Sequence, residues 1–111
     1  MIQSFSFGSI TIDGKTYYND VVIYPDHIQG EWWRSEGHKL TKEDVDEILT
    51  IKPDIIIIGT GYGGLKVPKE TEEYVKSMGI KLVVRETKKI CKIFNELSKS
   101  NKIIAALHLS C

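Results

Sequence analysis

The feature that most constrains the fold is an apolar run at residues 55–58, followed directly by a glycine-rich segment at residues 59–64. Four consecutive isoleucines lack the alternation of a half-exposed strand, so the run predicts a strand covered on both faces. The following segment has glycine at four of its six positions, which allows a sharp turn and leaves backbone N–H groups open to a ligand. Ligands of open α/β sheets favour the carboxyl ends of such strands. The sequence therefore predicts both a central strand and the place of a site.

The overall composition is that of one ordinary globular domain, residues 1–111, with 41% hydrophobic and 27% charged residues. Fifteen basic residues balance fifteen acidic ones, so no long-range field favours nucleic acid, an anionic membrane or an acidic substrate. The longest apolar run is too short to span a bilayer. We expect neither nucleic acid nor a membrane as a partner.

The two cysteines, Cys91 and Cys111, do not make a disulfide framework. This favours a reducing, cytoplasmic location. Cys91 falls on the apolar stripe of a predicted helix, so an inert buried thiol is favoured over a nucleophile, whereas Cys111 is expected to be exposed. His108 lies three residues from Cys111, but a chain end rarely holds catalytic geometry. No group of histidine, cysteine and aspartate residues has the spacing of a zinc site, and no cofactor is predicted.

An N-terminal meander of strands is predicted before the isoleucine run. Residues 4–12 alternate in polarity as one strand, with a shift of phase at Gly8, and Asp13-Gly14 favours a two-residue hairpin turn. Further strands are expected from Lys15, at residues 21–24 and, as a short edge strand, at residues 28–33.

Helical patterns then alternate with strands. Thr41 and Asp44 resemble a capping box, Pro68 suits a first helical position, and Gly79 suits the left-handed end of that helix. Thr87 is expected to cap a third helix, and Asn95 to lie on its surface or to bond backbone near residues 59–64. Strands at residues 81–85 and 103–109 complete an α/β domain, with helices packed on a central sheet.

Several motifs, spread over nearly the whole chain, occur together in one family. They are Trp33-Arg34, Gly37-His38-x-Leu40, Pro53-Asp54 leading into Ile58-Gly59-Thr60-Gly61, Thr87 to Asn95, and Ile104-Ala105-Ala106-Leu107. The combination resembles a small, widespread family that includes an adipogenesis-associated domain protein and a mitochondrial complex I assembly factor. The resemblance implies a three-layer single domain, with a mixed central sheet, helices packed on it and an N-terminal β-hairpin layer. Asn101-Lys102 stands where many members have Gly-Arg, so no role of that arginine carries over.

A second candidate cluster is Trp32-Trp33-Arg34 with His38. Adjacent tryptophans on a strand point to opposite faces, so one packs inward. The other, exposed beside Arg34, would offer a stacking surface and a planar cation to an anion or an aromatic partner. The plainer interpretation, which we favour, has both tryptophans covering the sheet edge and Arg34 paired with a carboxylate. His38 suits either a general base or a structural residue near a helix cap.

Two classes of function remain open. The first, which we choose, is a binding or assembly module that presents a surface to a protein partner. The alternative is a protein or enzyme that binds a small anionic ligand at the glycine segment, unless that segment is only a tight strand exit. No catalytic residue is assigned, and the sequence leaves open enzymatic activity and oligomeric state. The candidate ligand-binding residues are Gly59, Thr60, Gly61, Tyr62, Gly63, Gly64, Arg34 and His38.

Overall fold

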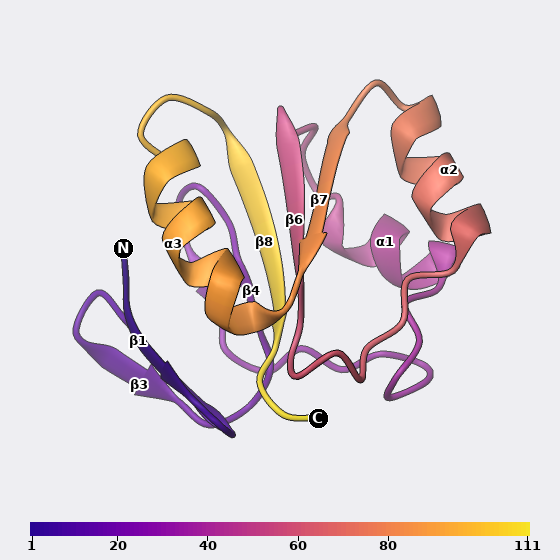
Figure 1. The fold of residues 1–111 in the computed structure, drawn as a ribbon. Coiled ribbons are helices and arrows are strands. Elements are labelled where there is room, and N and C mark those ends of the chain that lie inside the picture. Colours follow the sequence, from indigo (N-terminus) through magenta and orange to yellow (C-terminus); the bar gives the residue numbers. More distant parts are fainter.

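The computed structural model describes residues 1–111 as two β-sheets and three helices (Figure 1). A small antiparallel sheet has the order β1-β2-β3, and a five-stranded mixed sheet has the order β5-β4-β8-β6-β7. The predicted α/β class, with a mixed central sheet and an N-terminal hairpin layer, is confirmed. The elements in chain order are β1 (Ile2–Ser6), β2 (Ser9–Ile12), β3 (Lys15–Tyr17), β4 (Val21–Ile23), β5 (Ile28–Gln29), α1 (Lys42–Ile48), β6 (Ile55–Thr60), α2 (Lys69–Ser77), β7 (Lys81–Arg85), α3 (Thr87–Leu97) and β8 (Ile103–His108).

The isoleucine strand, β6, lies inside the large sheet, parallel to β8 on one side and to β7 on the other. All six of its residues are buried. Ile55 and Ile57 belong to one apolar cluster, whereas Ile56 and Ile58 belong to another on the opposite face. The prediction of a central strand covered on both faces is confirmed.

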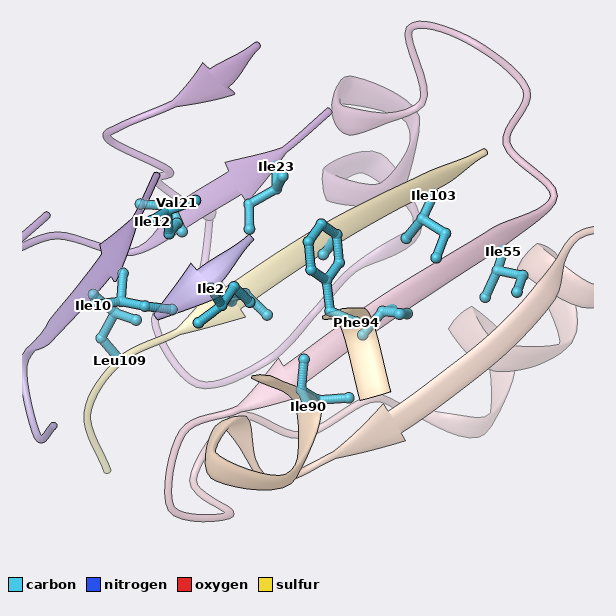
Figure 2. Packing of buried hydrophobic residues seen from close by; sticks show 13 residues of the cluster. Ile2, Ile10, Ile12, Val21, Ile23, Ile55, Ile90, Phe94, Ile103 and Leu109 are labelled. Carbon is cyan, nitrogen blue, oxygen red and sulfur yellow. The ribbon is translucent and has the colours of Figure 1, made fainter. Parts of the chain in front are cut away.

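Different elements cover the two faces of the large sheet (Figure 1). On one face, α3 and the small sheet enclose the cluster drawn in Figure 2, where Ile90 and Phe94 of α3 lie near Ile2 and Ile10 of the small sheet. On the other face, the apolar sides of α1 and α2 complete the second cluster. The result is a three-layer domain in which each face of β6 is buried by a different layer.

The predicted strand at residues 4–12 is wrong, because it is two strands joined by a turn. Phe7 and Gly8 form the turn, with Gly8 at φ 81°, and Phe5 pairs with Ile10 across the hairpin. Residues paired across a two-residue turn share a face but are an odd number of positions apart, so the shift of phase noted at Gly8 marks the turn.

The rest of the meander is confirmed only in part. Asp13 and Gly14 form the predicted turn, with φ of 48° and 83°. The predicted edge strand at residues 28–33 is limited to β5. The strand predicted at residues 21–24 does not stay with the hairpin, since β4 pairs antiparallel with β8 in the large sheet.

The helix boundaries follow local capping chemistry. Thr41 Oγ1 accepts the Asp44 N–H at 3.1 Å and the Asp44 carboxylate accepts the Thr41 N–H at 3.0 Å, so the predicted capping box is confirmed. Gly79 has φ 76° just after α2, as predicted. Pro68 occupies the N-cap of α2, one residue earlier than expected. None of the helices combines the length and apolarity that crossing a membrane requires.

We expect Ile57→Ala to lower the free energy of unfolding by about 2–4 kcal/mol, because Ile57 is fully buried and a cavity would remain. Urea denaturation measures the change. The matched control is Ile51→Ala, whose side chain is exposed, and we expect a change within about 0.5 kcal/mol there. A loss at Ile57 below about 1 kcal/mol would contradict the central placement of β6.

Candidate functional site

A buried ionic cluster lies where β8 ends. Asp20 precedes β4, Arg34 lies in the loop after β5, and His108 is the last residue of β8. Asp20 Oδ2 is hydrogen-bonded to His108 Nδ1 at 2.8 Å and forms an ion pair with Arg34 Nη2 at 2.9 Å. Asp20 Oδ1 accepts the Leu109 N–H at 2.8 Å. The side chains of Arg34 and His108 are only 5% and 6% exposed, so the fold holds a cation and an imidazole on one carboxylate beneath the surface.

The carboxylate of Asp20 is ionised at neutral pH. Burial raises the pKa of Asp20, but hydrogen bonds from His108, the Leu109 N–H and Arg34 outweigh that effect and bring the pKa below its ordinary value. The negative charge of Asp20 therefore balances the positive charge of Arg34.

The neighbours of His108 decide which ring nitrogen carries a proton. Nδ1 has two polar neighbours: it lies 2.8 Å from Asp20 Oδ2 and 3.3 Å from Arg34 Nη2, which also donates to the Gly37 carbonyl at 2.8 Å. The contact with Asp20 is the shorter of the two. An ionised carboxylate only accepts hydrogen bonds, so Nδ1 must carry the hydrogen that Asp20 receives. Nε2 is then the position at which His108 can meet another group.

Two buried polar atoms of this cluster have no hydrogen-bond partner, Arg34 Nη1 and His108 Nε2. Arg34 and His108 line a cavity of about 310 Å³, together with Asp20 and His38. The ring of His38 is edge-on to that of His108, with centroids 5.7 Å apart. Burying a polar atom without a partner costs free energy. Two such atoms, on residues that line one cavity, make this a candidate ligand site.

The glycine segment packs directly against the end of β8. Gly61 has φ 69°, and a Cβ there would lie 1.8 Å from the Ser110 carbonyl oxygen and 2.7 Å from His108 Cδ2. Only glycine fits this close approach. The Gly61 N–H donates to Thr87 Oγ1 at 2.8 Å, and that hydroxyl donates to the His108 carbonyl at 2.6 Å. The segment therefore supports the backbone of His108 from behind.

The backbone N–H groups of this segment are already bonded within the protein. Those of Tyr62, Gly63 and Gly64 donate to the carbonyl oxygens of Ser110, Thr60 and Cys111 at 3.4, 3.1 and 2.6 Å. The expectation that they are open to a ligand is therefore wrong. Arg34 and His38 both contact His108, against which Gly61 packs, so they do lie near this segment. Ligand binding by residues 59–64 stays a prediction.

Two polar residues of α3 have roles different from those predicted. Thr87 is not the N-cap, since Glu86 takes that position and makes no side-chain cap bond. Asn95 bonds both the N–H and the carbonyl of Ile2, each at 2.8 Å. Asn95 thus joins α3 to the small sheet, and the contact with the glycine segment considered for Asn95 is made by Thr87.

The two tryptophans have opposite environments, as predicted. Trp32 is 4% exposed, and the Arg34 guanidinium carbon lies over its ring, 4.4 Å from the ring centroid. Trp33 is 72% exposed. The pairing of Arg34 with a carboxylate, expected on the plainer interpretation, is confirmed in Asp20. The covering of the sheet edge by both tryptophans, expected on the same interpretation, does not hold for Trp33, whose side chain is exposed.

Four exposed aromatic side chains lie on or beside this cavity. Tyr18 and Trp33 line it. Phe7 precedes Gly8, another lining residue, and the ring centroids of Phe7 and Tyr62 are 5.5 Å apart. These four side chains, 53% to 74% exposed, are four of the six large hydrophobic side chains exposed in the protein. We call Phe7, Tyr18, Trp33 and Tyr62 the aromatic rim.

The sequence interpretation missed Asp20 and set His108 aside because it lies near the chain end. A usable signal was present. All six positions of β8 are buried, and His108 is the one titratable residue in a strand that otherwise reads as continuous apolar sequence. A buried imidazole needs a polar partner, so the strand itself called for an acid or an acceptor nearby.

Comparison with known protein families gives a match over almost the whole chain. The family described as "Protein of unknown function (DUF498/DUF598)" matches residues 2–108. Two relatives are both named NADH dehydrogenase (ubiquinone) 1 alpha subcomplex assembly factor 3. The Danio rerio protein is 26% identical over 108 residues, which cover 96% of this chain and 62% of the relative. The Mus musculus protein is 23% identical over 107 residues, covering 95% and 57%. The chain therefore spans about three fifths of the length of these curated relatives.

Solved structures share the fold over the full chain. A conserved hypothetical protein from Pyrococcus horikoshii is 29% identical, with a TM-score of 0.85 over 100% of this chain and 99% of that chain. A protein from Bordetella parapertussis has a TM-score of 0.84 at 14% identity, covering 98% and 94%. At that identity the second likeness shows the fold alone.

The two thiols are expected to differ in reactivity. Burial raises the pKa of Cys91 to about 11 from 9.0, and Cys91 Sγ donates to the Thr87 carbonyl. At about pH 8 the reactive thiolate of Cys91 is therefore about 100-fold scarcer than that of an ordinary thiol. We expect a thiol reagent to label the exposed Cys111 at once and Cys91 at a comparable rate only in urea. Equal, fast labelling of both thiols in the native protein would restore Cys91 as a candidate nucleophile.

Proposed function

This chain belongs to the family described as "Protein of unknown function (DUF498/DUF598)", and from that premise we propose that it is an assembly-type binding module that presents the aromatic rim to a protein partner. The observation that carries the proposal is the gathering of Phe7, Tyr18, Trp33 and Tyr62 at one end of the molecule. The names of the two assembly-factor relatives support an assembly-type role.

Exposed aromatic side chains that lie together have a physical meaning that scattered ones lack. Grouped exposed apolar side chains on a protein surface mark interaction sites. Tryptophan and tyrosine are also the side chains that most often dominate the binding energy of protein interfaces. The rim consists entirely of aromatic residues, and the chain carries no net charge. A partner with an apolar docking segment suits it better than one recognised by charge alone.

The rim is held by ordered backbone. Phe7 lies in the two-residue turn between β1 and β2, and the N–H of the adjoining Gly8 donates to the Leu109 carbonyl at 2.8 Å. Trp33 follows the buried Trp32, whose N–H donates to the Asp20 carbonyl at 2.8 Å. Docking on residues whose backbone is already ordered loses less conformational entropy. This favours a function in recognition for the rim.

A cytoplasmic location is part of the proposal. Cys91 and Cys111 are both free thiols. Free thiols persist in a reducing compartment, which suits the cytoplasm.

Affinity capture from a native extract tests the function. We expect Trp33→Ala combined with Tyr62→Ala to lower the recovery of specifically captured proteins about tenfold or more, because aromatic residues at interfaces commonly contribute more than about 1.4 kcal/mol each. Quantitative mass spectrometry of the captured proteins measures the loss.

The control variant is Ile51→Ala, which removes an exposed apolar side chain outside the rim. We expect it to capture the same proteins as the unchanged chain. Both variants alter exposed positions, so their unfolding free energies should stay within about 0.5 kcal/mol per substitution. Identical sets of captured proteins for all three chains would refute the rim as the docking surface.

A further inference from the structure

The guanidinium of Arg34 is held by two of its nitrogens, and the third has no hydrogen-bond partner. Nε and Nη2 donate to the Gly37 carbonyl at 3.1 and 2.8 Å, and Nη2 forms an ion pair with Asp20 at 2.9 Å. Trp32 lies 4.4 Å from the guanidinium carbon and supports one face. Nη1 has no partner, so two N–H donors of a cation are left beside the cavity.

The imidazole of His108 is fixed in the same way. Its Nδ1 is bonded to Asp20 at 2.8 Å, and its backbone carbonyl accepts the Thr87 hydroxyl at 2.6 Å. Its Nε2 is buried and without a partner. Arg34 and His108, which line the cavity, are thus each held by their other polar atoms, and each leaves one nitrogen without a partner.

We propose that this cavity binds a single carboxyl group, with one oxygen accepting from Arg34 Nη1 and the other bonded through a proton to His108 Nε2. A carboxyl group has two oxygens, which matches the two unpartnered nitrogens. A guanidinium stays charged at neutral pH and forms strong, charge-assisted hydrogen bonds to a carboxylate. The inference does not depend on a protein docked at the aromatic rim.

Charge balance adds a proton to the binding step. Arg34 and Asp20 neutralise each other, so a bound carboxylate brings one uncompensated negative charge into a buried site. A proton on His108 Nε2 restores neutrality and supplies the second donor. The charged and titratable groups around His108 are Asp20, Arg34 and His38. The segment behind it contributes only the uncharged Gly61 and Thr87.

Other small groups fit the two positions less well or in a different way. A carboxamide would place its carbonyl on Arg34 Nη1 and its N–H on a neutral His108 Nε2, without proton uptake. A phosphate would bring further oxygens and charge towards Asp20. The dependence of affinity on pH therefore separates a carboxyl group from a carboxamide of the same shape.

The two recognising atoms lie beneath the surface, and His38 is the neighbouring side chain that is exposed. His38 comes from an irregular loop and sits edge-on to His108.

Histidine side-chain ¹⁵N NMR tests the proposal on the unchanged protein, titrated with sodium acetate or acetamide at constant ionic strength. His27 is an internal control, because its Nδ1 lies 2.7 Å from Asp26 but the pair is exposed. We expect acetate to shift the His108 Nε2 signal along a saturable curve and to leave His27 unmoved. The affinity for acetate should fall as the pH rises, by up to about tenfold per pH unit, and the affinity for acetamide should not.

Two arginine variants complete the experiment. Arg34→Gln should abolish the response to acetate, whereas Arg85→Gln, at the only other arginine, should leave it intact. If Arg34→Gln does not fold, the comparison of His108 with His27 in the unchanged protein decides alone. A peptide with blocked termini and one glutamate distinguishes two sources of the carboxyl group. Tighter binding than that of acetate would assign a polypeptide side chain, and weaker binding would assign a free acid. Equal shifts at His27 and His108, or an acetate affinity independent of pH, would overturn the proposal.

Discussion

The carboxylate of Asp20 is the interaction on which the candidate site depends. Its two oxygens lie 2.8–2.9 Å from Leu109 N, His108 Nδ1 and Arg34 Nη2. These groups come from the end of β8 and from the loop after β5, so one side chain joins segments that are distant in sequence. The half-buried carboxylate is tolerated because both of its oxygens have polar partners. The same bonds leave Arg34 Nη1 and His108 Nε2 as the unpaired atoms.

The parallel pairing of β6 and β8 determines where this cluster lies. Thr60 is the register partner of His108, so both strands end together. The glycine segment and the last residues of the chain therefore meet at the same end of the sheet (Figure 1). A site at the carboxyl end of the central strand agrees with the general behaviour of open α/β sheets. The recognising groups, however, are side chains of Arg34 and His108, while the glycine segment packs behind them.

Features that depend on neighbouring residues could be predicted from the sequence. The burial of β6 follows from four adjacent isoleucines, and the start of α1 follows from Thr41 and Asp44. The cluster could not be predicted in this way, because Asp20 and His108 are 88 residues apart. They meet only because β4 leaves the N-terminal hairpin and pairs with β8. No local pattern in the sequence encodes that long-range pairing.

The tautomer of His108 tests the central claim most directly. Long-range ¹H–¹⁵N NMR at about pH 8, where an ordinary histidine is neutral, identifies which ring nitrogen carries the proton. We predict a proton on Nδ1, donated to Asp20, and an unprotonated Nε2. A neutral His108 with its proton on Nε2 would contradict the account, because Nδ1 could then not donate to Asp20 and the ionic cluster would not orient the site.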